Sequence, residues 1–139
     1  MRRHSGFTLI EIMIVVVIIG MLSALVGPRL IGQSDEAKIK TTKIQISQLE
    51  QTLGLFQLDN GFFPTTEQGL AALVKAPTIP PEPMNYKQGG YMRKLPKDAW
   101  GREFIYICPG QHGDFDIISY GSDGAEGGEG NAKDLNNWE

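Results

Sequence analysis

The stretch that decides the fold is GFTLIEIMIVVVIIG, residues Gly6 to Gly20. It opens an apolar run that continues to Val26 and contains a single charged side chain, Glu11. A helix rises about 1.5 Å per residue, so a run of about 20 residues reaches roughly 30 Å, the thickness of the hydrocarbon core of a bilayer. The sequence therefore predicts a helix that spans a membrane once.

The flanks of this run predict its orientation. Arg2 and Arg3 precede it without any acidic residue, and cationic flanks stay on the cytoplasmic side, so the rest of the chain is expected to cross outward. An ordinary secretory signal has a core of about 7–15 residues and a small-x-small cleavage site, to which SALVG, residues 23–27, is a poor fit. A buried core helix is a weaker alternative, because the remaining chain is too small to wrap the run.

Glu11 needs a partner inside such a span. A carboxylate near the middle of a bilayer costs about 2.5–3.5 kcal/mol on insertion scales, and more when it is unpaired. The span itself offers no base. The alternative is an acid that reaches back toward the headgroups from the helix end.

The basic leader that ends in Gly6, the Phe-Thr-Leu-x-Glu sequence after it and the apolar run together resemble the N-terminal signal of type IV pilins and type II secretion pseudopilins. The resemblance implies that a prepilin peptidase cuts between Gly6 and Phe7 and methylates the new Phe7 amine. It also implies that Glu11 pairs with the cationic Phe7 amine of a neighbouring subunit in a filament. An ion pair in lipid is strong only with good geometry, so this pair is expected to fix the register of assembly.

The helical pattern is interrupted once, at Pro28. Proline removes a backbone hydrogen bond and kinks or loosens a helix, so Pro28 is expected to be a hinge or a fixed kink. Ser34 is a plausible cap for a fresh helical start. The predicted organisation is a leader (1–6), a membrane and filament-core helix (7–33) and a periplasmic globular domain (34–139).

Residues 35 to 59 show a second helical periodicity. The apolar residues recur at intervals of seven, three, four and three, which places them on one stripe. They are Ile39, Ile46, Leu49, Leu53 and Phe56. The stripe predicts a helix that packs one face on the C-terminal domain and stops at Asn60-Gly61.

The remaining predicted elements are short. A helix is expected from about Glu67 to Val74, followed by a surface loop at 75–91 that holds four of the eight prolines. Two β-like runs, 102–108 and 115–121, flank PGQHGD and predict a hairpin. The predicted fold is therefore α+β, with a long N-terminal helix packed on a small antiparallel sheet.

The C-terminal segment is acidic and rich in glycine. From Asp114 to Glu139 lie seven of the 16 acidic residues, against one basic residue, Lys133. Calcium takes six to eight oxygen ligands, carbonyls included, in flexible geometry, and such a segment can supply them. The segment lacks the helix-flanked calcium-loop signature, so composition alone leaves a solvated loop and a calcium site equally open. Trp138 is suited to anchoring this segment on the domain.

Four further stretches extend the resemblance to the major pseudopilins of type II secretion over nearly the whole chain: FFPTTEQGLAALV, GGYMRKLPKDAWGREF, PGQHGDFDIISYGSDG and DLNNW. In that family a C-terminal loop binds calcium. The implied ligands are the Asp123 and Asp134 side chains and the Tyr120 and Ala125 carbonyls. Where some members have adjacent acids, this chain has Lys133 before Asp134, and Asn131 or Glu126 is the substitute ligand.

Other classes of function find little support. The formal charge of −3 and the pI of 5.4 argue against nucleic acid. The single Cys108 cannot form an intrachain disulfide and is expected to fill space in a strand. His112 is expected to be a solvated turn residue, and Asp114 and Asp116 to lie on a solvated strand edge. The G-x-S-x-G spacing fails at Gly121, and two histidines cannot supply the three of a catalytic zinc site, so no enzyme is expected.

The expected function is that of the major subunit of a periplasmic pseudopilus that drives export of folded proteins. The expected location is the bacterial inner membrane, crossed once, with the C-terminal domain in the periplasm. The implied partners are other copies of the chain, minor pseudopilins, an inner-membrane assembly platform and the prepilin peptidase, with Ca²⁺ as cofactor. The alternatives are a type IV pilin for adhesion or motility and a membrane-tethered periplasmic binding or enzymatic module.

Overall fold

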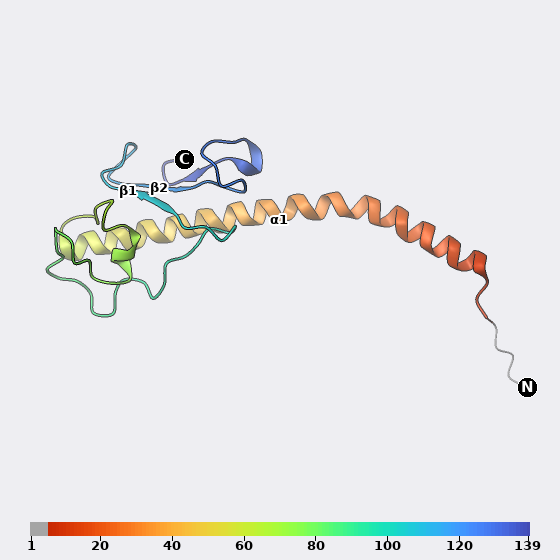
Figure 1. The fold of residues 1–139 in the computed structure, drawn as a ribbon, viewed down its shortest axis with the longest axis horizontal. Helices are drawn as coiled ribbons and strands as arrows, with labels where there is room; N and C mark the ends of the chain where they lie inside the picture. The colour runs from red at the N-terminus through yellow and green to blue at the C-terminus, as the bar shows by residue number, and fades with distance from the viewer. Residues whose placement is uncertain (1–5) are drawn as a thin grey trace, which may run out of the picture. The chain divides into compact units, whose positions relative to one another are not determined.

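The computed structural model describes residues 6–139, except that the side chains of residues 25–33 lie outside the described part. The elements in chain order are the helix α1 (Leu9–Asn60), the 3₁₀ helix η1 (Leu70–Leu73), the strands β1 (Ile105–Ile107) and β2 (Asp116–Ser119), the 3₁₀ helix η2 (Gly130–Ala132) and the strand β3 (Leu135–Asn136) (Figure 1). The chain divides into two units, with the boundary between Glu36 and Ala37.

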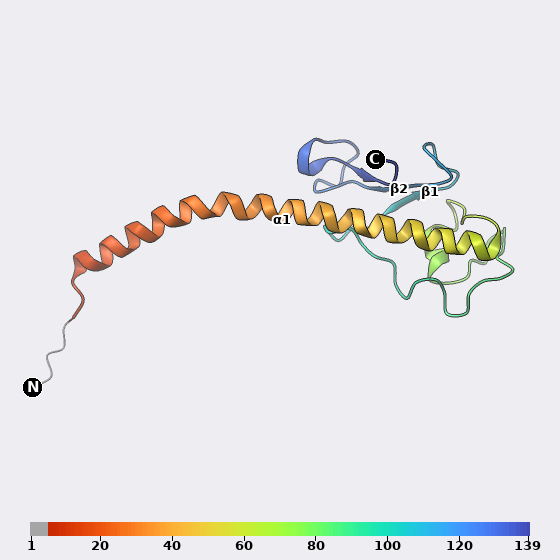
Figure 2. The ribbon, with the colours of Figure 1, turned by 180° about the vertical axis from the view of Figure 1, so that it is seen from behind.

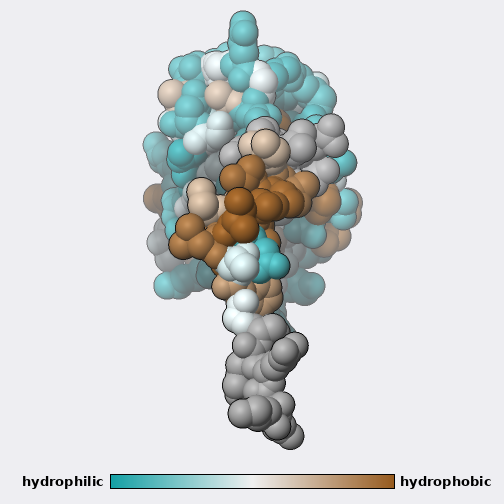
Figure 3. Space-filling model, turned by 90° about the vertical axis from the view of Figure 1, so that its right-hand side faces the viewer, coloured by the Kyte–Doolittle hydropathy of each residue, from teal (hydrophilic) through white to brown (hydrophobic). Residues whose placement is uncertain are grey.

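The N-terminal unit contains the apolar start of α1. Every large apolar side chain from Phe7 to Leu22 is at least half exposed, and Figure 3 shows a brown, hydrophobic surface gathered around this segment. Within the described residues, no helix combines the length and the hydropathy of a membrane span. The predicted span from Phe7 to Val26 stays a prediction, and its last two side chains fall in the range that is not described.

The helix α1 runs without interruption through Pro28 and Ser34. The fresh helical start predicted at Ser34 is therefore wrong. Proline removes only its own N–H donor, and the turns on both sides keep theirs, so a helix can continue past one proline. The side chain of Pro28 lies outside the described residues, and its role as a hinge stays a prediction, as does the domain boundary after residue 33.

The apolar stripe on the second half of α1 forms the core of the C-terminal unit. Ile46, Leu49, Leu53 and Phe56 are buried, as predicted, and Ile39 is partly buried. Burying each of these side chains contributes about 1.5–3 kcal/mol. The Phe56 ring lies among three other rings, with centroids 5.7 Å from Phe62, 6.3 Å from Tyr86 and 5.3 Å from Tyr91.

The helix predicted at Glu67–Val74 is shorter in the structure and is a 3₁₀ helix, η1. Gly69, immediately before it, has φ +60°, a left-handed conformation that glycine adopts at little cost and that a helix interior does not contain. The buried Gln68 is bonded elsewhere, because its Nε2 donates to the carbonyls of Ile79 and Pro81, both at 2.8 Å. Gln68 thus holds the predicted proline-rich loop against the domain.

The sheet has the order β1-β2-β3, with both pairs antiparallel. Tyr106 pairs with Ile117 in the predicted hairpin, and both side chains are buried. The strand β3, which the sequence analysis did not predict, adds Leu135 opposite Ser119. Figures 1 and 2 show the sheet along one side of the second half of α1, with the segment that contains the proline-rich loop on the other. The sheet and the loop after β2 therefore form one side of the domain.

Candidate functional site

The first predicted site lies at the start of α1, where Thr8 and Glu11 cap the helix together. Glu11 Oε2 accepts a hydrogen bond from Thr8 N at 2.8 Å and one from Thr8 Oγ1 at 3.0 Å. The Glu11 N–H donates in return to Thr8 Oγ1 at 3.3 Å. This reciprocal arrangement is a capping box, which satisfies N–H groups that a helix start otherwise leaves without a partner.

The capping box gives Glu11 a partner within its own chain that the sequence analysis missed. The signal was present, because Thr-x-x-Glu immediately before an apolar run is the spacing of a capping box. The side chain of Phe7 is 84% exposed beside it. The pairing of Glu11 with the Phe7 amine of another subunit stays a prediction.

The second predicted site is the loop of residues 120–134 between β2 and β3. Its first turn is closed by the Gly124 N–H, which donates to the Tyr120 carbonyl at 3.2 Å. Its two sides are joined where the Ser122 N–H donates to the Asn131 carbonyl at 3.4 Å. The loop is therefore folded on itself through main-chain groups.

The two predicted carboxylate ligands, Asp123 and Asp134, accept hydrogen bonds from loop amides. Asp123 Oδ1 accepts from Ala125 N at 3.1 Å, and Asp134 Oδ2 accepts from Gly127 N at 2.8 Å. The other oxygen of Asp134, Oδ1, is buried without a hydrogen-bond partner. A buried acceptor without a donor is costly, and a cation removes that cost, so this oxygen of Asp134 suits a calcium ion.

Among the described residues, no three acidic, cysteine or histidine side chains gather closely enough to hold a metal ion. The predicted set does not require such a cluster, because it consists of two carboxylates and two main-chain carbonyls. Glu126, one of the two suggested substitute ligands, lines the same cavity as Asp134. The calcium site stays a prediction.

This cavity, about 270 Å³, lies over the outer face of the sheet. At its rim the rings of His112 and Trp138 are stacked, with centroids 3.8 Å apart and planes at 7°. The prediction that Trp138 anchors the C-terminal segment is thus confirmed, and its anchor is the hairpin turn. The side chain of His112, predicted to be solvated, is 45% exposed, and its Nδ1 lies 3.1 Å from Asp116 Oδ2.

The solvated strand edge predicted for Asp116 is wrong, since this side chain is 2% exposed. Its carboxylate accepts hydrogen bonds from Gln111 N at 2.8 Å and from His112 N at 3.2 Å. Burial by itself raises the pKa of Asp116, but these hydrogen bonds and the His112 ring outweigh it and hold the pKa below its ordinary value. Asp116 therefore fixes the hairpin turn.

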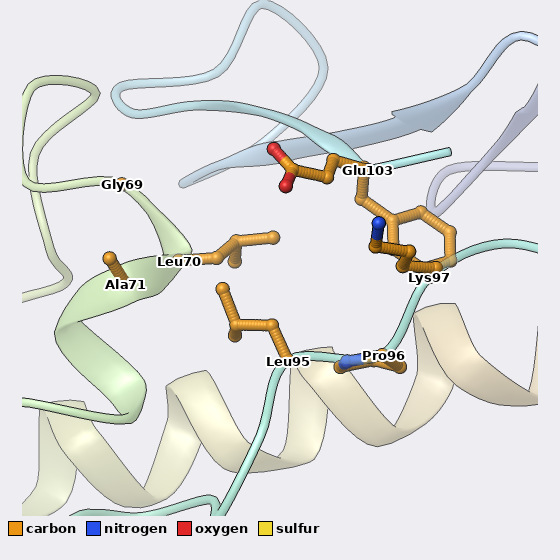
Figure 4. Close-up of a pocket in the computed structure, with 8 residues that line it drawn as sticks. Gly69, Leu70, Ala71, Leu95, Pro96, Lys97 and Glu103 are labelled. Atoms are coloured by element: carbon orange, nitrogen blue, oxygen red, sulfur yellow. The ribbon is translucent and has the colours of Figure 1, made fainter. Parts of the chain in front are cut away.

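A further cavity, about 250 Å³, lies between η1 and the segment at residues 95–97 (Figure 4). Leu70 and Leu95 point into it, and Lys97 and Glu103 lie at its edge. Its lining contains no serine, threonine, cysteine or histidine. Lys97 and Glu103 are the charged residues of this lining.

A capped apolar helix start, a helix that continues into a domain core and a small antiparallel sheet define a pilin-like protein. A crystal structure of the major pseudopilin from the type 2 secretion system of enterohaemorrhagic Escherichia coli matches the fold with a TM-score of 0.70 and 47% sequence identity, over 80% of this chain and 95% of that chain. The profile of the family described as type II secretion system (T2SS), protein G matches residues 29–138, and that of the prokaryotic N-terminal methylation motif matches residues 1–27. The chain belongs to the type II secretion system protein G family.

Relatives named type II secretion system core protein G match nearly the whole chain. The protein of Vibrio cholerae is 49% identical over 138 residues, which are 99% of this chain and 94% of the relative. That of Dickeya chrysanthemi is 50% identical over 137 residues (99% and 88%), and that of Escherichia coli K12 is 46% identical over 136 residues (98% and 92%). The family resemblance and the pilin-like fold class are confirmed, and the pseudopilin interpretation is favoured over the type IV pilin. Family and methylation motif together imply a membrane-anchored subunit of a periplasmic pseudopilus.

Proposed function

We propose that the chain, as a pseudopilin of type II secretion, is cleaved between Gly6 and Phe7 and crosses the inner membrane once through residues 7–26. We further propose that it polymerises into the filament that drives export of folded proteins. The observation that carries the proposal is the apolar surface from Phe7 to Leu22, where every large apolar side chain is at least half exposed. Soluble monomers rarely expose a contiguous apolar patch of this kind. Lipid covers this surface before assembly, and neighbouring copies cover it afterwards.

The proposed polymer is an open filament. In the proposed filament, each copy contacts the next through two different faces, and a contact of this kind that does not close generates an open helical filament. Cleavage frees an ammonium group at Phe7, four residues before Glu11 in the sequence. In the subunit, the Glu11 carboxylate is held by Thr8. In the filament, it pairs with the Phe7 amine of a neighbour, and the geometry that such a pair needs in lipid sets the register.

The chain acts as a structural part and not as an enzyme. Its proposed partners are further copies of itself, the minor pseudopilins, the inner-membrane assembly platform and the prepilin peptidase. The energy for assembly comes from a cytoplasmic ATPase of that platform. The support for this assignment is the family, which is a structural component of the secretion system.

Calcium binding by the loop of residues 120–134 is the second part of the proposal. Asp123 and Asp134 supply carboxylates, Tyr120 and Ala125 supply carbonyls, and Glu126 lines the adjoining cavity. A bound Ca²⁺ supplies positive charge to these oxygens. The partnerless, buried Oδ1 of Asp134 supports the assignment. Because the loop has almost no apolar surface to bury, the ion takes the structural place of a core there.

The proposal is tested in cells that carry the rest of a type II secretion system but lack this gene. Wild-type chain should restore secretion and, when overproduced, give filaments visible by electron microscopy. Glu11→Val should be cleaved normally but yield few filaments and leave the secreted proteins in the periplasm. Normal secretion in cells without any functional copy of the chain would contradict the function, and normal filaments from Glu11→Val would contradict the pairing.

A further inference from the structure

The side chain of Arg102 reaches the C-terminal loop from a distant part of the sequence. Its Nη1 donates to the Gly121 carbonyl at 2.6 Å, and its Nη2 donates to the Ser122 carbonyl at 3.2 Å. The guanidinium therefore holds two consecutive carbonyls with its planar fork of donors. Hydrogen bonds from a charged donor are stronger than neutral ones.

The backbone of Arg102 is itself fixed to the same part of the sheet. The Arg102 N–H donates to Asp98 Oδ1 at 2.8 Å, and Ser119 Oγ donates to Asp98 Oδ2 at 2.8 Å. Asp98 is 4% exposed, and Ser119 is the last residue of β2. Arg102 and the end of β2, which leads into the loop, are thus anchored on one buried carboxylate, so the guanidinium is positioned in advance.

The loop leaves room for the guanidinium at Gly124. This residue has φ +70°, and a Cβ placed there would lie 2.6 Å from Arg102 Cζ and 2.7 Å from Arg102 Nε. The backbone conformation favours glycine at this position, and a side chain there would displace the guanidinium. The first turn of the loop, closed by the hydrogen bond from Gly124 N to the Tyr120 carbonyl, folds against the arginine.

The second half of the loop is held differently. The Gly127 N–H donates to Asp134 Oδ2, while Asp134 Oδ1 is buried without a hydrogen-bond partner. In the first half of the loop, the guanidinium of Arg102 donates hydrogen bonds to two carbonyls. In the second half, Asp134 Oδ1 has no donor. The two halves therefore have different needs for an added positive charge.

We infer that Arg102 is a built-in cation that orders residues 120–125 without calcium, so that the ion is needed only to order residues 126–134. The division between the two halves rests on the calcium function proposed above, whereas the arginine contacts do not. The Tyr120 carbonyl, one of the proposed ligands, is then already ordered before the ion binds. Arg102 is in this sense a positioning residue for the loop.

The test measures amide hydrogen exchange by NMR on the full processed chain in detergent micelles, first with chelator and then with saturating CaCl₂. The Gly124 amide reports on the first half and the Gly127 amide on the second. In wild type, the Gly124 amide should be protected in chelator, while the Gly127 amide gains protection only on adding calcium. Arg102→Met should make the Gly124 amide exchange about tenfold faster or more in chelator, because the charged hydrogen bonds to the Gly121 and Ser122 carbonyls are lost.

Three controls keep the result interpretable. Arg93→Met removes another exposed arginine and should leave the Gly124 amide unchanged. Arg102→Lys keeps the charge but not the fork, and should give intermediate protection. The Ile117 amide of β2 should stay protected in every variant if the domain remains folded. An unchanged Gly124 amide in Arg102→Met with chelator overturns the inference. A Gly127 amide that ignores calcium in wild type overturns the calcium function and leaves the arginine result standing.

Discussion

Thr8 and Glu11 cap the start of α1 by reciprocal hydrogen bonds, with Glu11 Oε2 2.8 Å from Thr8 N and the Glu11 N–H donating to Thr8 Oγ1 at 3.3 Å. The carboxylate that makes the apolar segment unusual is therefore already satisfied within the subunit. In lipid, where water cannot serve the free N–H groups of a helix start, such a cap is worth more than at a wet surface. The subunit thus has a resting arrangement that assembly exchanges for another.

Removing only the Thr8 hydroxyl tests whether the cap affects cleavage of the subunit, filament formation or both. Thr8→Val should be cleaved as wild type and give at least as many filaments as wild type, because assembly exchanges the bond that the Thr8 hydroxyl makes to Glu11 for the pair with Phe7. The loss of a cap costs about 0.5–2 kcal/mol. Mass spectrometry of the processed subunit and the filament yield measure the two effects. Ser23→Ala is the matched control, since Ser23 Oγ only donates to the Ile19 carbonyl at 2.8 Å within the same helix. Fewer filaments from Thr8→Val than from Ser23→Ala would contradict the exchange of partners on assembly.

The apolar stripe predicts that alanine substitutions of two leucines of α1 change the free energy of unfolding by very different amounts. Leu53 is 0% exposed, whereas Leu58 is 81% exposed. Leu53→Ala should lower the free energy of unfolding by about 2–5 kcal/mol, because it removes buried methyl groups and leaves a cavity. Leu58→Ala should change it by no more than about 0.5 kcal/mol. Urea unfolding of the full chain in detergent gives both values, and similar losses would show that the stripe is not the core.

The hydrogen bonds to Asp116 in the hairpin turn predict that the stability of the domain depends on pH. The hydrogen bonds to Asp116 hold its pKa below the ordinary value of 3.8, so its ionised form stabilises the fold. That contribution is complete above the ordinary pKa and is lost as the pH falls through the lower pKa of the folded state. Asp116→Asn should therefore melt at a lower temperature than wild type at pH 7, and the difference should shrink below about pH 4.

Asp114→Asn is the control for this experiment, because Asp114 is exposed in the same turn. Its melting temperature should follow that of wild type at every pH. Curves for Asp116→Asn and wild type that stay parallel down to about pH 2 would show that the carboxylate adds no pH-dependent stability.

Calcium should raise the melting temperature of the full chain in detergent. An ion present at about 100 times its Kd stabilises the folded state by about 2.7 kcal/mol. Asp134→Asn should abolish most of this gain, while Glu82→Gln, on the proline-rich loop, should keep it. Magnesium should replace calcium poorly, because it demands a tight octahedron of ligands. A melting temperature that is the same in calcium and in chelator would exclude the proposed site. A rise with calcium that persists in Asp134→Asn would also exclude it.

What the sequence could predict was carried by periodicity and by local turn chemistry. Leu49, Leu53 and Phe56 are buried because their spacing puts them on one face of a helix, and the hairpin forms where two β-like runs flank a glycine-rich turn. The Thr8–Glu11 capping box was readable by the same local logic. At Ser34 that logic failed, since a suitable cap residue does not start a helix where the preceding helix continues.

What could not be predicted depends on contacts between distant residues. The strand β3 has only two residues, too few for any alternation, and exists because Leu135 pairs with Ser119. The burial of Asp116 is decided by the turn that folds over it. The reach of Arg102 to a carbonyl 19 residues further along the chain has no signature in the sequence.

Electron cryomicroscopy of the assembled filament at near-atomic resolution tests the central claim most directly. We expect density that joins the Glu11 carboxylate of one subunit to the methylated Phe7 amine of a neighbour, at a distance of about 4 Å or less. A filament in which every Glu11 carboxylate remains bonded only to Thr8 of its own chain, with the Phe7 amines elsewhere, would contradict the account.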